Sequence, residues 1–186
     1  MPISTADFKN GICIEYNDKL WTIVEFQHVK PGKGGAFVRT KLRDVRTGRQ
    51  VEYTFNSGTK FDSVRLESKK MQYLYNDGSD FYFMDNDTYE QMSVSADVVG
   101  EISQWLKEND EATLNYAGSE LISVEPQMFV ELEITDTEPG FKGDTVQGGT
   151  KPATLETGAT IQVPMYINVG ESVQVDTRDG RFVKRI

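Results

Sequence analysis

One glycine-rich segment of the chain combines residue types that could bind an anionic ligand. It reads Lys-Pro-Gly-Lys-Gly-Gly-Ala over residues 30–36, so glycines surround a single lysine. Glycine lets a backbone approach a ligand closely and adopt positive φ angles, and a lysine ammonium is a compact charge on a flexible stem. We therefore expect a loop, stiffened by its proline, that presents Lys33 alone to a partner. The loop residues are Pro31, Gly32, Lys33, Gly34 and Gly35.

A phosphate-binding Walker loop is the obvious alternative for a lysine among glycines. That motif needs the pattern G-x-x-x-x-G-K-[ST] between a strand and a helix. Here Lys33 is followed by Gly34, and the next residues are typical of a strand rather than a helix. The sequence therefore excludes a nucleotide-hydrolysing site in this loop.

Cationic side chains gather around the same loop. Residues 28–49 hold seven of them against a single acid, a local charge of +6 in a chain whose formal net charge is −9. The cations are Lys30, Lys33, Arg39, Lys41, Arg43, Arg46 and Arg49. Because side chains alternate along a strand, the three cations of residues 39–43 would share one face. That face could hold nucleic-acid phosphates, while the overall negative charge would suppress loose binding to arbitrary nucleic acid. The alternative is a solvated strand face.

The chain lacks the residues that most catalytic sites require. Cys13 and His28 are its only cysteine and histidine, which excludes an intrachain disulfide, a cysteine-based zinc cluster and any site needing two imidazoles. Cys13 lies in an apolar segment, where a buried and unreactive thiol is expected. His28 lies beside the loop, where it either meets a phosphate or packs beneath the hairpin. We expect no enzymatic activity of the chain's own.

A group of acidic residues could suggest a calcium site. The residues are Asp77, Asp80, Asp85, Asp87 and Glu90. They lack the ligand spacing of an EF-hand loop, so we expect a solvated acidic face. The sequence predicts neither a metal nor a cofactor.

Most of the chain is predicted to form short strands. Segments rich in β-branched and aromatic residues alternate with turn residues, roughly every 8–12 residues. The segments are 12–16, 20–26, 36–42, 51–55, 71–75, 81–84, 113–116, 120–124, 128–134, 160–164 and 172–176. Asp77-Gly78 predicts a two-residue type I′ turn in a hairpin. The pattern indicates an all-β protein built of sandwiches or small barrels.

One helix is predicted after Ser95, a plausible N-cap residue. Its apolar residues follow a 3.6-residue period and would form one stripe. They are Val98, Ile102, Trp105 and Leu106. We expect a helix that packs on a core and carries no chemistry.

The distribution of charge divides the chain into three parts. Residues 1–63 carry a net charge of +3, residues 64–127 of −9 and residues 128–186 of −3. Three small barrels with these bounds, in an elongated arrangement, fit the number of predicted strands better than one large sandwich.

The sequence also predicts where the protein acts. The N-terminus lacks a basic region followed by an apolar run, and no stretch approaches the roughly 18 apolar residues of a membrane span. We therefore expect a cytoplasmic protein with no membrane partner.

Two spaced motifs resemble one known family. The C-terminal third follows the pattern Lys151-x-Ala153-x4-Gly158-x2-Ile161-x-Val163-Pro164-x2-Ile167-x2-Gly170. The loop at residues 30–36, the Arg-x-Lys-Leu-Arg run at 39–43 and the Gln-Tyr-Leu-Tyr run at 72–75 are also typical of that family. Over essentially its whole length the chain is similar to bacterial translation elongation factor P.

The resemblance implies a fold and a function. The fold would be an N-terminal SH3-like (KOW) barrel followed by two OB-fold barrels, arranged in an L like tRNA. The protein would act as a monomer that binds the 70S ribosome between the peptidyl-tRNA and exit sites and promotes peptide-bond formation at consecutive prolines. Lys33 would reach the CCA end of the peptidyl-tRNA, and in many members a modifying enzyme extends this residue covalently.

The resemblance also implies contact residues. Contacts to RNA phosphates, in tRNA and ribosomal RNA, would come from His28, Lys30, Arg39, Lys41, Arg43 and Arg46. Contacts to exit-site mRNA or the small subunit would come from Gly143, Asp144, Thr145, Gly148, Gly149, Phe182 and Arg185. The family has tyrosine where this chain has Phe182, so a hydrogen bond from that position is lost while stacking or packing can remain.

Two alternatives stay open at this point. One is a paralogue of elongation factor P with a different substrate range. The other is a general RNA-binding protein of OB barrels, whose exposed aromatic residues would act as stacking platforms.

Overall fold

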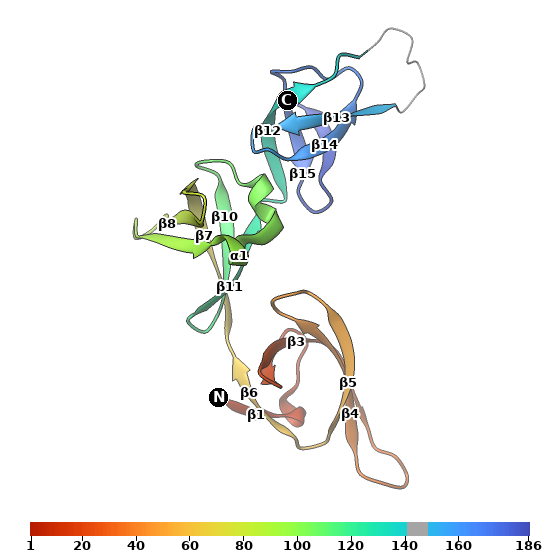
Figure 1. The fold of residues 1–186 in the computed structure, drawn as a ribbon. Helices are drawn as coiled ribbons and strands as arrows, with labels where there is room; N and C mark the ends of the chain where they lie inside the picture. The colour runs from red at the N-terminus through yellow and green to blue at the C-terminus, as the bar shows by residue number, and fades with distance from the viewer. Residues whose placement is uncertain (141–148) are drawn as a thin grey trace. The chain divides into compact units, whose positions relative to one another are not determined.

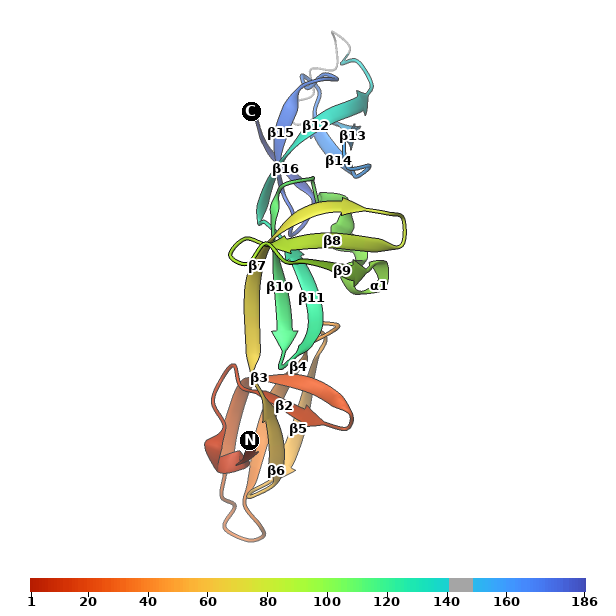
Figure 2. The ribbon, with the colours of Figure 1, turned by 90° about the vertical axis from the view of Figure 1, so that its left-hand side faces the viewer.

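The computed structural model describes residues 1–140 and 149–186. Over these residues the chain forms three β-sheets, one of six strands and two of five. The sheets are strongly curled (Figures 1 and 2), as small barrels require, and the predicted all-β class is confirmed. By its contacts the chain divides into two compact units, residues 1–68 with 115–123 and residues 69–114 with 124–186.

The first unit contains the N-terminal sheet, whose strand order is β1-β6-β2-β3-β4-β5. Its elements are β1 (Pro2–Ser4), the 3₁₀ helix η1 (Thr5–Asp7), β2 (Cys13–Tyr16), β3 (Lys19–Val29), β4 (Phe37–Asp44), β5 (Gln50–Asn56) and β6 (Lys60–Val64). Its buried core consists of Phe8, Ile14, Ile23, Val38, Leu42, Phe55 and Phe61. Asn17 and Asp18 connect β2 to β3 with φ angles of 51° and 58°, the left-handed values that a two-residue type I′ turn requires.

Strands β3 and β4 form the hairpin that carries the glycine-rich loop. Their pairing starts at Val29 opposite Phe37 and continues to Trp21 opposite Asp44, with one irregularity between Ile23 and Glu25. β5 pairs with β4 on its other side. The loop at residues 30–36 therefore leaves the end of a three-stranded ribbon (Figure 1).

The middle sheet has the strand order β11-β10-β7-β8-β9. Its strands are β7 (Leu66–Asn76), β8 (Asp80–Asp85), β9 (Gln91–Ser95), β10 (Glu111–Ala117) and β11 (Glu120–Pro126). The predicted hairpin of β7 and β8 is confirmed, but the predicted type I′ turn is wrong. Three residues connect the strands, and only Gly78, with φ +96°, is left-handed. The carboxylate of Asp77 instead accepts the N–H groups of Ser79 and Asp80 at 3.0 and 2.8 Å and closes the turn with its side chain.

The predicted helix is present but broken. It consists of α1 (Ala96–Val99) followed by the 3₁₀ helix η2 (Gly100–Trp105). The break lies at Gly100, whose φ of +65° leaves the helical region. Ser95 occupies the N-cap position without a side-chain cap bond. The expected core packing is confirmed for Trp105 and Leu106, which are buried, but before Gly100 the buried residue is Val99 and not the predicted Val98, which is only partly buried.

The second unit also contains the C-terminal sheet, in the order β14-β13-β12-β15-β16. Its strands are β12 (Phe129–Thr137), β13 (Thr150–Leu155), β14 (Thr160–Pro164), β15 (Ser172–Asp176) and β16 (Arg181–Arg185). Among the described residues, twelve buried ones form its core, including Trp105 from η2, and Ile102 packs against them. The helical segment that follows β9 thus contributes to the core of the C-terminal sheet.

The structure contains two compact units where three barrels were predicted. Strands of the middle sheet are shared between the two units, so the bounds 1–63, 64–127 and 128–186 stay a prediction. None of the helices in residues 1–140 and 149–186 is long and apolar enough to cross a membrane.

Candidate nucleic-acid interface

The glycine-rich loop exposes Lys33 without a partner. Its base is fixed where the carbonyl of Ala36 accepts the N–H of Ser57 at 3.0 Å. Lys33 is exposed, and within the part of the chain that the structure describes it makes neither a hydrogen bond nor an ion pair. Its ammonium group is therefore free to bind another molecule, as the sequence predicts.

Only one glycine of the loop is needed for its backbone conformation. Gly34 has φ +102°, a value strained for any residue with a side chain, whereas Gly32 and Gly35 do not adopt positive φ. A Cβ atom at any of the three would meet no atom within 4 Å. The lack of a side chain at Gly32 and Gly35 therefore relieves no contact within the described residues and leaves room beside Lys33.

The predicted alternation of cations along β4 is confirmed. Arg39 and Arg43 are exposed and Lys41 is partly exposed. The residues that alternate with them, Val38, Thr40 and Leu42, are buried. Thr40 also fixes the ribbon, because its hydroxyl donates to the carbonyl of Tyr53 at 2.7 Å. The outer face of β4 therefore presents a row of three cations.

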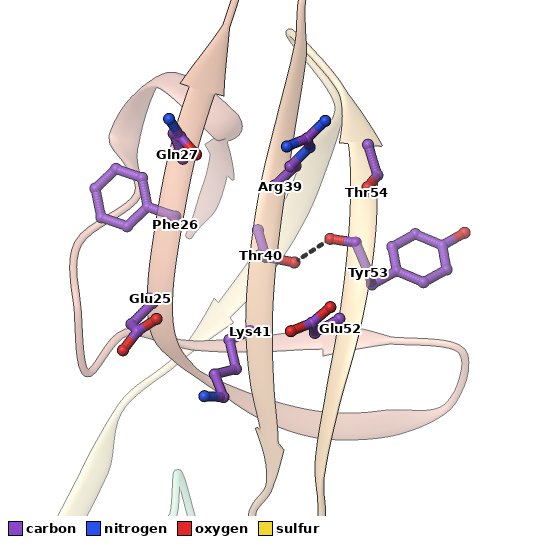
Figure 3. A pocket seen from close by; sticks show the side chains of 9 residues that line it. All are labelled: Glu25, Phe26, Gln27, Arg39, Thr40, Lys41, Glu52, Tyr53 and Thr54. Carbon is purple, nitrogen blue, oxygen red and sulfur yellow. Dashed lines mark hydrogen bonds between the residues drawn. The ribbon is translucent and has the colours of Figure 1, made fainter.

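Two carboxylates that sequence reasoning missed lie beside this row. Lys41 is opposite Glu25 on β3 and opposite Glu52 on β5. Arg39, by contrast, is opposite the uncharged Gln27 and Thr54. These side chains surround a hollow of about 630 Å³ on the outer face (Figure 3). The positive charge of Lys41 is thus offset by its neighbours, whereas Arg39 and Arg43, which is opposite Thr22 and Gln50, have no acid opposite them. Strand register, which the sequence does not reveal, produces this difference.

Arg39 is also oriented by an aromatic neighbour. Its guanidinium carbon lies 5.6 Å from the centre of the Phe37 ring, a distance at which a cation is attracted to the ring face. Phe37 is the first residue of β4 after the loop. Arg39 therefore lies at the loop end of the ribbon, the end that also carries Lys30 and Lys33.

Arg46 lies at the opposite end of the ribbon. β4 has eight residues, which span about 26 Å in an extended strand. Arg46 follows β4 and forms an ion pair with Glu120, and its N–H donates to the buried carboxylate of Asp44 at 2.9 Å. Burial raises the pKa of Asp44, but hydrogen bonds from Arg46 and Thr47 outweigh it and hold the pKa below its ordinary value. The structure therefore separates Arg46 from Lys33, and its contact with RNA stays a prediction.

His28 lies on the other face of the hairpin from Arg39. It pairs with the inward-facing Val38, and its ring meets Phe26 edge to face, with centroids 5.7 Å apart at 85°. The packing alternative is supported, although the side chain is exposed. A phosphate contact from His28 stays a prediction.

The C-terminal motif residues lie in the core. Ala153, Ile161, Val163 and Ile167 are at most 4% exposed, and the buried ammonium of Lys151 donates to the carbonyl of Glu138. The motif therefore identifies a barrel rather than a binding surface. Of the loop residues predicted to contact RNA, Gly149 is exposed, whereas Gly143, Asp144, Thr145 and Gly148 lie outside the described residues.

Phe182 and Arg185 on β16 have different environments. Phe182 is half-buried and packs against the C-terminal core, so packing is the role that remains without a hydroxyl. The Arg185 guanidinium lies 5.7 Å from the centre of the Tyr166 ring and its Nη1 is 3.2 Å from Oε1 of Glu171. Tyr166 is 58% exposed. Its contact with Arg185 was not predicted, because the turn that holds Tyr166 is distant from Arg185 in the chain.

An ion pair fixes the turn between β15 and β16. The Asp176 carboxylate accepts Nε and Nη2 of Arg178 at 3.0 and 2.7 Å, and the N–H of Arg178 at 3.0 Å. Hydrogen bonds from the Arg178 side chain lower the pKa of Asp176 to about 2. The strand that carries Phe182 and Arg185 is therefore anchored by a group that protonates only in strong acid.

Asp176→Asn is expected to lower the stability of the protein at pH 7 but not in acid. The pKa in the folded state lies below the unfolded value of about 3.9, so the carboxylate stabilises the fold above pH ~4 and loses this effect as the pH falls towards 2. Urea unfolding at pH 7 and at pH 2.5 measures the difference between variant and wild type at each pH. The exposed Asp62 provides the control, Asp62→Asn. An equal difference for Asp176→Asn at both pH values would contradict the assignment.

The prediction that Cys13 is a buried thiol is confirmed. The side chain is 2% exposed, and burial raises the pKa of the thiol to about 11. Within the described residues, no three histidine, cysteine or acidic side chains converge to hold a metal ion.

Comparison with known proteins places the three sheets in one family. The family model for the Elongation factor P (EF-P) KOW-like domain matches residues 4–61, that for the EF-P OB domain matches residues 66–124, and that for the Elongation factor P C-terminal domain matches residues 130–185. The chain belongs to the elongation factor P family.

Curated relatives agree with this family, and a solved structure agrees with the fold. Elongation factor P of Caldanaerobacter subterraneus subsp. tengcongensis is 53% identical over 184 residues, which cover 99% of this chain and 100% of that protein. Elongation factor P of Saccharopolyspora erythraea is 51% identical over 183 residues, 98% of this chain and 97% of that protein. The fold is similar to that of a translation initiation factor eif-5a family protein from Naegleria fowleri, with a TM-score of 0.54 and 18% identity over 67% of this chain and 97% of that chain. The resemblance to elongation factor P predicted from the sequence is confirmed, and the chain is a translation elongation factor.

Proposed function

We propose that this member of the elongation factor P family binds the 70S ribosome, between the peptidyl-tRNA and exit sites, and promotes peptide-bond formation at consecutive prolines. The observation that carries the proposal is the exposure of Lys33 at the end of a hairpin, free of any partner within the described residues. Its partners would be the peptidyl-tRNA, ribosomal RNA and mRNA in the exit site, in the cytoplasm.

The proposed mechanism is positional. Proline is rigid and a poor acyl acceptor, so a prolyl peptidyl-tRNA spends little time in a geometry that permits attack. Holding the reactants in alignment lowers a barrier by several kcal/mol, up to about 7–11 in favourable cases. Lys33 would restrict the CCA end through contacts with its backbone or sugars, while ribosomal RNA supplies the chemistry. The protein is then a translation factor without a reaction of its own.

The cations of β4 would hold the tRNA by its phosphates. Such contacts position a protein on RNA without reading the sequence. The register favours Arg39 over Lys41, because Lys41 lies between Glu25 and Glu52. Arg43 has no acid opposite it either, but Arg39 lies nearer the loop that carries Lys33, so its loss should matter most for binding.

A covalent extension of Lys33 is the second part of the proposal. The free ammonium group and the open space at Gly32 and Gly35 would accommodate both a modifying enzyme and the added group. Intact-mass spectrometry of protein purified from its own cells, with peptide mapping of residues 30–36, tests it. An unmodified mass would contradict this part and leave the proposed contact of Lys33 with the CCA end to be judged by translation.

Arg39→Ala is expected to weaken ribosome binding more at low salt than at high salt. Loss of one phosphate contact reduces the slope of log affinity against log salt by about 0.7–0.9. Filter binding to vacant ribosomes at several salt concentrations measures both the affinity and the slope.

Arg49→Ala is the matched control, because Arg49 is exposed at the other end of the ribbon and we propose no contact between it and RNA. An Arg39 variant with the slope and affinity of the wild type would show that the row of cations is only a solvated face.

A further inference from the structure

The outer face of the middle sheet carries a stacked pair of tyrosines that the proposed function does not use. Tyr75 on β7 lies opposite Tyr82 on β8, and their rings are 4.6 Å apart and inclined by 16°. Tyr75 is 45% exposed, whereas Tyr73 and Phe83, on the inner face, are buried. The pair is therefore held on a rigid sheet with part of its aromatic surface open to solvent.

On the same face, the residues beside the pair on β9 and in the row towards Met84 are uncharged. Ser93 on β9 lies opposite Tyr82, and the next row contains Gln72, Met84 and Gln91. Met84 is partly exposed and adds a polarisable, adaptable surface. The tyrosine rings and Met84 thus form the apolar part of a face that extends over three strands.

The charges closest to the tyrosines are negative. The Tyr82 hydroxyl donates to Asp77 at 2.9 Å, and this hydrogen bond raises the pKa of Tyr82. Asp80 precedes Tyr82 by two residues on the same face, about 7 Å along the strand. Within the described residues, the Asp80 carboxylate has no ion pair and no hydrogen bond of its own. Residues 71–106 contain seven acids and no lysine, arginine or histidine.

These charges exclude one occupant and favour another. Single-stranded nucleic acid stacks its bases on aromatic side chains only where a positive groove holds its phosphates, and here carboxylates would repel them. A guanidinium group suits the surface instead, because it stacks on aromatic faces and pairs with carboxylates through parallel N–H bonds. The charge complementarity therefore selects an arginine-bearing partner.

We propose that the outer face of β7, β8 and β9 is a docking surface for an arginine-bearing segment of a basic protein. An arginine of the partner stacks on Tyr75 and pairs with Asp80, while Met84 covers the adjacent apolar part of the segment. The contact is separate from Lys33 and gives the factor a protein partner in addition to RNA.

Titration of the full chain with defined probes tests this proposal. The probes are a fluorescein-labelled 12-residue peptide of alternating arginine and glycine, the same peptide with lysine for arginine, and a 12-residue uridine RNA. We expect the arginine peptide to bind more tightly than the lysine peptide, the RNA not to bind this face, and amide resonances of residues 72–84 to shift. Tyr75→Ala should lower the affinity for the arginine peptide about three- to tenfold, the range of a partly desolvated cation–π contact. Tyr75→Phe should retain the affinity.

A pair of matched charge variants keeps the test decisive if Tyr75→Ala fails to fold. Asp80→Asn removes one negative charge from the face, and Asp62→Asn removes one from the N-terminal sheet, where Asp62 is exposed. Only Asp80→Asn should lower the affinity for the arginine peptide. Equal effects of the two variants, unchanged binding by Tyr75→Ala, or resonance shifts confined to other sheets would overturn the proposal. Preferential binding of the RNA to residues 72–84 would overturn it in favour of a stacking platform for nucleic acid.

Discussion

Lys33→Ala is expected to abolish the rescue of synthesis through three consecutive prolines while leaving the fold intact. Lys33 is exposed and makes no hydrogen bond or ion pair within the described residues, so its removal should cost little packing, and Gly34 keeps its left-handed backbone. The rate of Pro-Pro-Pro synthesis in a reconstituted translation system should fall at least about tenfold, which is ~1.4 kcal/mol of barrier. Urea unfolding followed in parallel should give the wild-type midpoint.

Two further variants identify what Lys33 contributes. Lys60→Ala removes another exposed lysine of the same sheet and should leave the rescue unchanged. Lys33→Arg keeps a positive charge and removes the amine that a modifying enzyme would extend, so it separates the charge from the modification. Full rescue by Lys33→Ala would contradict the assignment of this loop to the CCA end.

Features that depend on a few consecutive residues could be predicted from the sequence. The glycine-rich loop and the alternation along β4 are of this kind, because both follow from the conformational freedom of glycine and the two-residue period of a strand. The buried thiol of Cys13 is another. The C-terminal motif predicted the family because it records a packed core, in which Ile161 and Val163 alternate inward.

Features that depend on which segments meet could not be predicted. Glu25 and Glu52 flank Lys41 only because three strands pair in one register. Arg46, counted with the basic group in the sequence, pairs with Glu120, which lies 74 residues away in the chain. Both effects offset positive charge, so fewer uncompensated cations remain on the ribbon than the sequence indicates.

Local rules also failed where a side chain competed with the backbone. Asp-Gly favours a type I′ turn, but the Asp77 carboxylate accepts two backbone N–H groups and a tyrosine hydroxyl and stabilises a longer turn. The type I′ turn forms instead at Asn17-Asp18, where both residues tolerate positive φ. The predicted helical period describes the packing of Trp105 and Leu106, but Gly100 divides the helix, and before it Val99 is buried in place of Val98.

Among the apolar residues of the predicted helix, Trp105 is expected to contribute most to the free energy of unfolding. The residue is 6% exposed and lies in the core of the C-terminal sheet, although it comes from the helical segment after β9. Its ring also packs against Gly180, where an added Cβ would lie 3.3 Å from two ring carbons. The tryptophan therefore ties the helical segment to β12–β16 within one compact unit.

Trp105→Ala is expected to destabilise that unit by about 3–5 kcal/mol, the usual cost of truncating a buried tryptophan. At a urea m-value of about 1–3 kcal/mol/M, the unfolding midpoint followed by circular dichroism should fall by more than ~1 M. Trp21, the only other tryptophan, lies in the N-terminal sheet, so its fluorescence in the variant should keep the midpoint that it shows in a Trp105→Phe protein. Trp105→Phe should lose less stability, because an aromatic ring still fills most of the site. A wild-type midpoint by circular dichroism for Trp105→Ala would show that η2 does not hold the C-terminal sheet, and a large fall in the Trp21 transition would show that the two units unfold as one.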